Sequence, residues 1–287
     1  MSDNLRGAGL MALAMAGFAV EDMFIKLLAD ALPVGQILLA LGLGGSVAFA
    51  GVAMRKGQQI YSPALLSRAV LMRNLAEMIG TVGFVLGFVL ASLATASAIL
   101  QAAPLVVTLG AVAFLGEKVG WRRWTAIVLG FLGVLLIVRP GMAGFEPASL
   151  FAVVGVLGLA GRDLATRVVP RSISSYQLSA WAFAMMVPSG IFLMIVMGEA
   201  PVMPNLLQTA ALLSALGIGV LAYYAIVAAM RVGELSFVTP FRYTRMLFAL
   251  VIAILVFGER PDALTLTGAV IIVAAGLFTL WREKKAA

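Results

Sequence analysis

The chain has 287 residues, of which 62% are hydrophobic and 11% are charged, and it carries a formal charge of +7. A soluble domain is closer to half apolar and a quarter charged, so this composition excludes one and predicts an integral membrane protein made of helices. The positive charge does not indicate nucleic-acid binding, because the basic residues lie in short stretches between apolar runs. The chain has no Cys and no His, which excludes disulfides, thiolate nucleophiles and histidine chemistry, and we expect no cofactor and no metal site.

Ten apolar runs are predicted to cross a bilayer, and short connections join them. Arg6 and the apolar residues that follow it resemble a signal peptide. We expect this first run to be retained, because a related run recurs later in the chain. The ten runs cover approximately residues 7–29, 33–54, 67–90, 94–115, 121–139, 148–168, 175–197, 207–229, 235–257 and 263–281.

Basic residues gather at one end of these runs. If the N-terminus lies in the cytoplasm, fourteen Lys and Arg residues lie at cytoplasmic ends, and three, namely Lys26, Arg139 and Arg260, lie at the other ends. Short loops rich in positive charge stay on the cytoplasmic side. We therefore expect a multi-pass protein of a bacterial-type inner membrane with both termini in the cytoplasm.

The first and sixth runs share a pattern of charges. With an offset of 141 residues, Asp22 aligns with Asp163 and Lys26 aligns with Arg167. In both runs an acid precedes a base by four residues, so the two side chains lie on one helix face. A buried acid–base pattern that occurs twice indicates a duplicated membrane unit.

The alignment continues through the fourth and ninth runs. Pro104–Glu117 and Met246–Glu259 both end in Gly-Glu at an offset of 142, and an apolar run containing glycine follows each. Each half, residues 1–141 and 142–287, is therefore predicted to hold five runs. Because five is an odd number, the second half must enter the membrane upside down, which is a common plan of secondary transporters.

These span ends and the glycine-bearing runs behind them resemble the EamA-type domain of the drug/metabolite transporter superfamily, and the tandem covers nearly the whole chain. The resemblance implies an all-α polytopic membrane protein with ten transmembrane helices, built as two inverted five-helix repeats around a central cavity. It also implies transport of metabolites by alternating access, often of amino acids outward. Among the members of the superfamily, the chain is most similar to exporters of the aromatic-amino-acid type.

Two prolines lie inside predicted spans at positions that do not match. The first half has Pro104, whereas the second half has Met246 at the aligned position and Pro240 six residues earlier. A proline inside a helix removes a backbone hydrogen bond and kinks it. We expect both prolines to act as hinges, with kinks that are not symmetric.

Polar residues within the spans are the candidates for substrate binding or gating, because a charge in a bilayer costs roughly 2.5 kcal/mol or more and normally faces a bundle interior. We place the two acids of the first run in the outer half of the membrane and the charges of the third, sixth and ninth runs in the inner half. The candidates are Glu21, Asp22, Glu77, Gln101, Arg162, Asp163, Tyr223, Tyr224, Arg242, Tyr243 and Arg245.

Arg242 and Arg245 are three residues apart on one helix face, and with Arg162 they are predicted to attract a carboxylate. Tyr223 and Tyr224 point about 100° apart, so at most one of them is expected to face a cavity.

A structural ion network is the alternative to substrate binding. Arg73 lies near enough to the end of its run to reach the membrane surface, or Glu77 neutralises it. Glu117 and Glu259 end spans beside glycine and are interpreted as structural.

The favoured hypothesis is a transporter that exports a zwitterionic metabolite such as an amino acid. Arginines suit its carboxylate, a buried acid suits its ammonium group, and aromatic rings suit an apolar side chain. The alternative is a transporter of anionic sugar phosphates or nucleotide sugars, which would need more positive charge. An enzyme is not expected, because no motif places paired acids on opposing spans. The expected partners are a small-molecule substrate and the lipid bilayer, with no obligate protein partner.

Overall fold

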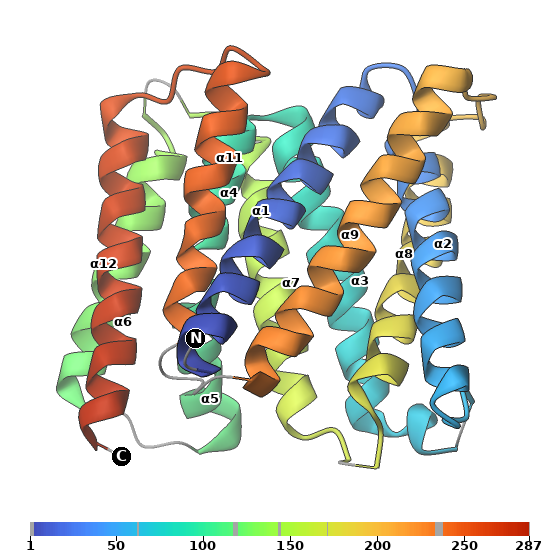
Figure 1. Ribbon diagram of the computed structural model, residues 1–287. Coiled ribbons are helices and arrows are strands. Elements are labelled where there is room, and N and C mark those ends of the chain that lie inside the picture. Colours follow the sequence, from blue (N-terminus) through green and yellow to red (C-terminus); the bar gives the residue numbers. More distant parts are fainter. Residues whose placement is uncertain are drawn as a thin grey trace.

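The computed structural model describes residues 3–61, 63–116, 120–142, 145–170, 172–232 and 238–286. These ranges are almost entirely helical and contain no strand (Figure 1). The α-helices are α1 (Asp3–Ala29), α2 (Val34–Arg55), α3 (Arg68–Leu90), α4 (Leu93–Leu100), α5 (Ala103–Leu115), α6 (Trp121–Val138), α7 (Ser149–Arg167), α8 (Ser175–Met197), α9 (Leu206–Val232), α11 (Thr244–Leu255) and α12 (Ala263–Ala286). Two short 3₁₀ helices, η1 (Pro63–Leu66) and η2 (Thr239–Tyr243), complete the described secondary structure.

Most of these helices are long and apolar enough to cross a membrane. Seven described stretches qualify by length and composition, when α4 and α5 are counted as one stretch from Leu93 to Phe114. Shorter apolar helices cover Trp124–Val138 in α6 and Ala263–Phe278 in α12. Together with η2 and α11, these elements place helix in each of the ten predicted runs.

Two of the spans are not continuous α-helices, since α4 is separated from α5 in one and the 3₁₀ helix η2 runs directly into α11 in the other. Gln101 and Ala102 separate α4 from α5, and Pro104 lies in the first turn of α5. In the same way, Pro240 lies in the first turn of η2, which leads into α11. A proline at the start of a helix sacrifices no hydrogen bond, because the first N–H groups of a helix have no partner within it. The prolines therefore begin helical segments rather than bend continuous ones.

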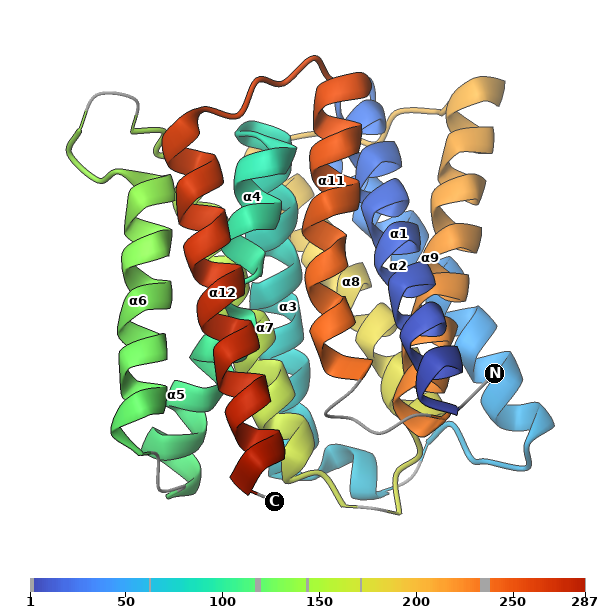
Figure 2. The same ribbon diagram turned by 60° about the vertical axis from the view of Figure 1, so that its left-hand side comes forward.

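The helices pack side by side in five pairs, which are α1 with α9, α2 with α8, α3 with α7, α4 with α11 and α6 with α12 (Figures 1 and 2). Helix α1 starts, and helix α12 ends, on the same side of the molecule, at the bottom of both views. We call this side the terminal side and the other one the opposite side.

Glycines allow the closest of these contacts. A Cβ atom on Gly83 of α3 would lie 2.6 Å from the backbone nitrogen of Gly155 in α7, and one on Gly80 would lie 2.7 Å from that of Leu159. Gly158 of α7 faces Gly80 in return. Small residues let two membrane helices approach until their backbones touch. This approach brings the polar residues of α3 and α7 within reach of each other.

Candidate functional site

A chain of charges joins α3 to α7. Arg162 Nη1 lies 3.1 Å from Glu77 Oε1, and Arg162 Nη2 lies 2.9 Å from Asp163 Oδ1. Glu77 Oε2 lies 3.2 Å from Arg73 Nη2. The Glu77 carboxylate thus lies between two guanidinium groups, and the neighbouring Gly80 and Gly158 explain why the helices are close enough for this contact.

One expectation about this chain of charges is wrong. Arg73 does not reach the membrane surface, because its side chain is only 3% exposed. The alternative holds: Glu77, one turn further along α3, supplies the countercharge. A buried guanidinium needs such a partner to offset the loss of its hydration.

A second ion pair joins α1 to α11. Arg245 Nη2 lies 2.7 Å from Asp22 Oδ2, and the guanidinium carbon lies 5.2 Å from the ring centroids of both Phe18 and Phe84. This guanidinium therefore meets an acid and two aromatic faces, each of which attracts a cation. The prediction that Asp22 and Arg245 occupy separate halves of the membrane is wrong, because the two side chains form an ion pair. Arg245 lies near the middle of its span, since α11 begins only at Thr244.

Arg242 lies near this network without an ion pair to any residue in the described ranges. It is close enough to Asp163 to act on it electrostatically, and the Asp163 side chain is 32% exposed. We use the name internal charge cluster for the charged residues of these two groups of ion pairs together with Arg242. Its seven members are Asp22, Arg73, Glu77, Arg162, Asp163, Arg242 and Arg245.

The two interrupted spans meet at a pair of aligned residues. Gln101 Nε2 donates a hydrogen bond of 3.0 Å to the backbone oxygen of Tyr243. The Tyr243 ring packs into the notch left by Gly276 in α12, where its hydroxyl is buried and has no hydrogen-bond partner among the described residues. The amide of one interrupted span therefore pairs with the backbone of the other.

Aromatic rings gather beside the internal charge cluster. The ring of Tyr223 lies 6.4 Å from that of Phe18, 5.5 Å from that of Phe49 and 5.7 Å from that of Phe183, measured between centroids. Tyr223 also lies near Arg162 of the internal charge cluster. Tyr224 is 53% exposed on the outer face of α9 and is not part of this group.

Glu21 differs from the other acids of the spans. Its side chain faces α9, where a Cβ atom on Gly219 would lie 2.6 Å from the Glu21 carboxyl carbon. The residue is 9% exposed and makes no ion pair with any described residue. Asp22, the next residue, holds the nearby cation Arg245.

On the opposite side, Glu259 connects three elements. Its carboxylate accepts hydrogen bonds from Lys26 Nζ at 2.8 Å, from Ser92 Oγ at 2.9 Å, and from the backbone N–H groups of Leu93 at 2.9 Å and Ala94 at 3.0 Å. Burial alone would raise the pKa of Glu259. The hydrogen bonds from Lys26 and from the Leu93 and Ala94 N–H groups lower the pKa by more than burial raises it, so the pKa lies below its ordinary value. The residue thus ties α1 and the connection before α12 to the N-terminus of α4, where a negative charge is favourable.

Only part of this contact is predicted from the sequence. Glu259 was interpreted as structural, and Lys26 and Ser92 were not among the candidates. A signal for Ser92 existed, since serine is a preferred N-cap, and it accepts a hydrogen bond from the Thr95 backbone N–H at 3.0 Å. Glu117, the counterpart of Glu259, lies outside the described residues.

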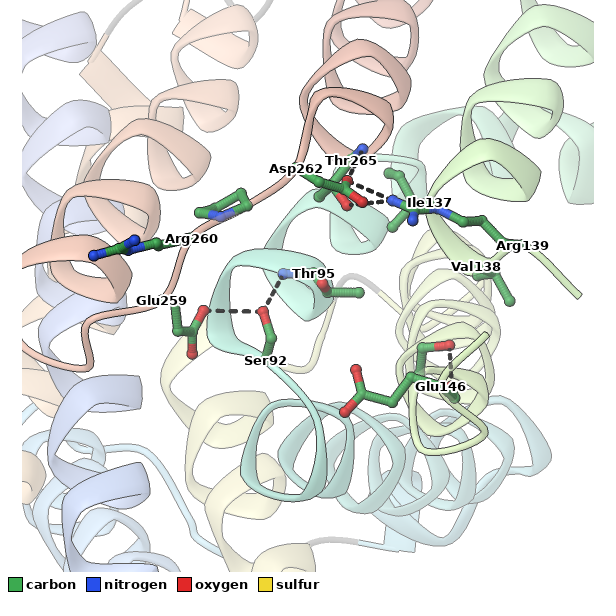
Figure 3. Close-up of a pocket in the computed structure, with 12 residues that line it drawn as sticks. Ser92, Thr95, Ile137, Val138, Arg139, Glu146, Glu259, Arg260, Asp262 and Thr265 are labelled. Atoms are coloured by element: carbon green, nitrogen blue, oxygen red, sulfur yellow. Dashed lines mark hydrogen bonds and ion pairs between the residues drawn. The ribbon is translucent and has the colours of Figure 1, made fainter. Parts of the chain in front are cut away.

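A polar pocket of about 290 Å³ opens beside this contact (Figure 3). On its far wall Arg139 donates hydrogen bonds to Asp262 and to Thr265. The hydrogen bonds from Arg139 and from the Thr265 backbone lower the pKa of Asp262 to about 2. The carboxylate of Glu146 also lines the pocket, whose described walls belong to the ends of α4, α6, α7 and α12.

A second pocket lies on the terminal side. It measures about 480 Å³ and lies between the connection after α2 and the connection before α8. Its polar walls include Gln58, Gln59, Ser174 and Gln177. The two pockets open at the ends of the bundle, whereas the internal charge cluster lies between helices within it.

Comparison with known proteins identifies two copies of one unit. The pattern of the EamA-like transporter family matches residues 5–139 and, a second time, residues 147–281. The chain is 24% identical to an S-adenosylmethionine uptake transporter of Rickettsia felis over 98% of this chain and 95% of that protein. It is 33% identical to a riboflavin transporter of Vibrio cholerae over 66% and 63% of the two chains.

Two further similarities cover nearly the whole chain. A pseudopaline exporter of Pseudomonas aeruginosa is 29% identical over 99% of both proteins. One solved crystal structure shares the fold with a TM-score of 0.60 and 16% identity, over 93% of this chain and 97% of that one.

Proposed function

The chain belongs to the EamA-like transporter family and is a multi-pass membrane transporter rather than an enzyme, and from this premise we propose that it carries an amino acid or an amino-acid derivative by alternating access. The related proteins named above carry S-adenosylmethionine, riboflavin and pseudopaline. S-adenosylmethionine, like a free amino acid, bears a carboxylate and an ammonium group. We propose the bacterial inner membrane as the location and cytoplasmic termini, in line with the distribution of basic residues. We also propose outward transport, as in the related pseudopaline exporter.

The observation that carries this proposal is that a partly exposed acid, Asp163, lies near an arginine, Arg242, that has no ion pair in the described ranges. Asp163 and Arg242 act on each other electrostatically, and Asp163 is 32% exposed. An ammonium group suits Asp163, and a carboxylate suits Arg242. The rings of Phe18, Phe49 and Tyr223 lie beside the cluster and suit an apolar or aromatic side chain.

The charge balance of the spans disfavours the sugar-phosphate alternative. Asp22 is bound to Arg245, and Glu77 is bound to Arg162 and Arg73. These acids neutralise the arginines that a phosphorylated substrate would need. A zwitterion needs no excess of either charge.

The inverted repeat is part of the proposal, with residues 1–141 and 142–287 as its halves. Exchanging the first five spans with the second five turns the pair α1–α9 into the pair α7–α3, and it leaves the pairs α2–α8, α4–α11 and α6–α12 unchanged. This pattern of pairs is what a two-fold relation between the halves would produce, and it supports the proposal. We propose that the halves rock about a cavity at the internal charge cluster.

The interrupted spans supply the proposed hinges. Pro104 lies in the first turn of α5, directly after the break between α4 and α5. Pro240 lies in the first turn of the 3₁₀ helix η2, which leads into α11. The hydrogen bond from Gln101 to the Tyr243 backbone links the two interruptions. Rotation at these points would let the ends of the fourth and ninth spans move while their other halves stay packed.

Counterflow in proteoliposomes tests the proposal independently of transport direction. Vesicles are loaded with phenylalanine, S-adenosylmethionine, riboflavin or a hexose phosphate, and uptake of the labelled compound is measured. We expect exchange of phenylalanine or S-adenosylmethionine and none of the hexose phosphate. Arg242→Gln should reduce this uptake, whereas Arg68→Gln, on the exposed start of α3, should not. Exchange of the hexose phosphate alone would contradict the proposal.

A further inference from the structure

The four acids within the described membrane spans are not equivalent. Asp22, Glu77 and Asp163 each form an ion pair with an arginine, whereas Glu21 forms none with a described residue. A charged carboxylate without a partner is costly inside a membrane, and it needs a countercharge or a proton to remain there. The described ion pairs supply no countercharge for the Glu21 carboxylate.

The two copies of the repeat make the difference explicit. At the offset of 141, Glu21 of α1 aligns with Arg162 of α7, and at the offset of 142, Glu77 of α3 aligns with Gly219 of α9. In one copy the aligned pair is the ion pair between Arg162 and Glu77, with 3.1 Å between Nη1 and Oε1. In the other copy it is Glu21 packed against a glycine. In the second helix contact, the position of the base therefore holds an acid, and the position of the acid holds a glycine.

The packing also limits what can occupy the site. The Glu21 carboxyl fills the space beside Gly219, so closely that even a methyl group there would overlap its oxygen. One turn away, Gly17 of α1 packs against Ala222 with similar closeness. This side of the carboxyl has no space for a hydrated metal ion or an ammonium group. A proton needs no such space.

Other charged groups near α1 are already engaged or stand on other faces. Of these, Asp22 and Arg245 act on Glu21 electrostatically, and they are bound to each other. Helix α2 contributes no charged residue before Arg55. The titratable or charged groups on the remaining elements packed against α1 are Arg242 and Tyr243 on η2, Tyr223, Tyr224 and Arg231 on α9, and Arg68, Arg73 and Glu77 on α3.

We propose that Glu21 is a proton-binding site that couples proton movement to the separation of α1 from α9. A carboxylate oxygen of Glu21 takes a proton from water on one side of the membrane and holds it while α1 and α9 are packed together. It returns the proton to water on the other side when the helices part. The inference rests on the transporter assignment of the chain but on no particular substrate.

The test needs no substrate, because the proton is the probe. The full chain is reconstituted in vesicles of phosphatidylethanolamine and phosphatidylglycerol, and infrared difference spectra are recorded between low and high pH. The wild type should show a carbonyl band of a protonated, buried carboxyl group that Glu21→Gln lacks. Glu77→Gln is the matched control, since Glu77 is equally buried but ion-paired, and it should keep the band. Persistence of the band in Glu21→Gln overturns the proposal.

A second readout tests the coupling. A pH jump applied to the same vesicles on a solid-supported membrane should displace charge transiently in the wild type, and Glu21→Gln should abolish this signal while Glu21→Asp restores part of it. An unchanged signal in Glu21→Gln overturns the proposal. If Glu21→Gln does not fold, Gly219→Ala replaces it: the added methyl group overlaps the carboxyl and must shift the pH at which the band appears, and no shift overturns the proposal. Both readouts stay informative if no compound in the counterflow panel is transported.

Discussion

Arg245 contacts three side chains in the interior of the bundle. It pairs with Asp22 at 2.7 Å and lies against the rings of Phe18 and Phe84. It thereby connects α11 to α1 and α3 through one side chain. A guanidinium group suits this position, because its planar face stacks on rings while its edge donates to a carboxylate.

Removal of one partner should expose the energetic value of this pair. Arg245→Gln leaves Asp22 buried without a countercharge and is expected to destabilise the protein by about 3–5 kcal/mol. The double variant Asp22→Asn/Arg245→Gln should lose less than the sum of the two single variants. Thermal unfolding of the purified protein measures both effects, with Arg68→Gln as the control. Additive losses would mean that the two side chains do not interact.

Glu259 makes stability depend on pH. Since its pKa in the folded protein is lowered from 4.5, its stabilising contribution is fully present above about 4.5 and is lost as the pH falls through the lower folded value. We expect Glu259→Gln to flatten the acid limb of the stability profile, and Lys26→Gln to move the loss of stability to higher pH. Thermal unfolding at a series of pH values measures this. A Glu259→Gln profile identical to that of the wild type would contradict the expectation.

Among the helices, the pair α3–α7 depends on the absence of side chains at its contact. Gly80 and Gly83 of α3 face the backbone of α7 closely enough that a Cβ atom would lie 2.6 to 2.7 Å from its nitrogens. The same approach positions Glu77 for Arg162. Packing of the helices and pairing of the charges are therefore two results of one contact.

Substitution of these glycines should separate the effect of packing from that of helix propensity. Gly83→Ala adds a methyl group where there is no space and is expected to cost about 1–3 kcal/mol. Gly51→Ala in α2, where nothing lies within 4 Å of the added atom, should be neutral or stabilising by up to roughly 1 kcal/mol. The two variants are compared by thermal unfolding. Equal effects would show that the α3–α7 contact is looser than the structure indicates.

Across the whole molecule, the proposed alternating access requires contacts at the opposite side and within the bundle to open in turn. On the opposite side, Glu259 ties Lys26 of α1 to the start of α4. Within the bundle, Asp22 and Asp163 occupy aligned positions of the two halves and belong to different ion pairs. A rocking motion that opens one side has to exchange one set of contacts for the other.

The two aligned acids should therefore bias the conformation in opposite directions. Asp22→Asn is expected to favour forms open on the opposite side, and Asp163→Asn forms open on the terminal side, because each removes a contact that closes its side. The chain has no native cysteine, so Thr95→Cys and Gln58→Cys, in the two pockets, report accessibility to a thiol reagent. A bias toward the same side in both variants would refute reciprocal closure.

Hydropathy was sufficient to predict the helical membrane fold and its ten runs, and the resemblance of the span ends to EamA-type domains predicted the family. These properties are local or periodic: a run of apolar residues has to be helical in a bilayer, whatever surrounds it. The aligned charges in the first and sixth runs likewise revealed that the unit is duplicated. The sequence also located the candidate residues, since a charge within an apolar run is conspicuous.

Only the tertiary structure decided which of these residues meet. That Arg245 binds Asp22, that Glu77 lies between Arg73 and Arg162, and that Tyr224 faces outward all depend on how each helix is rotated about its axis and how closely it approaches its neighbour. Those two quantities arise from side-chain packing between segments far apart in the chain, such as the glycines of α3 and α7. The interruptions at Gln101 and before α11 then set the depth of the residues beyond them, which periodicity along an unbroken helix does not predict.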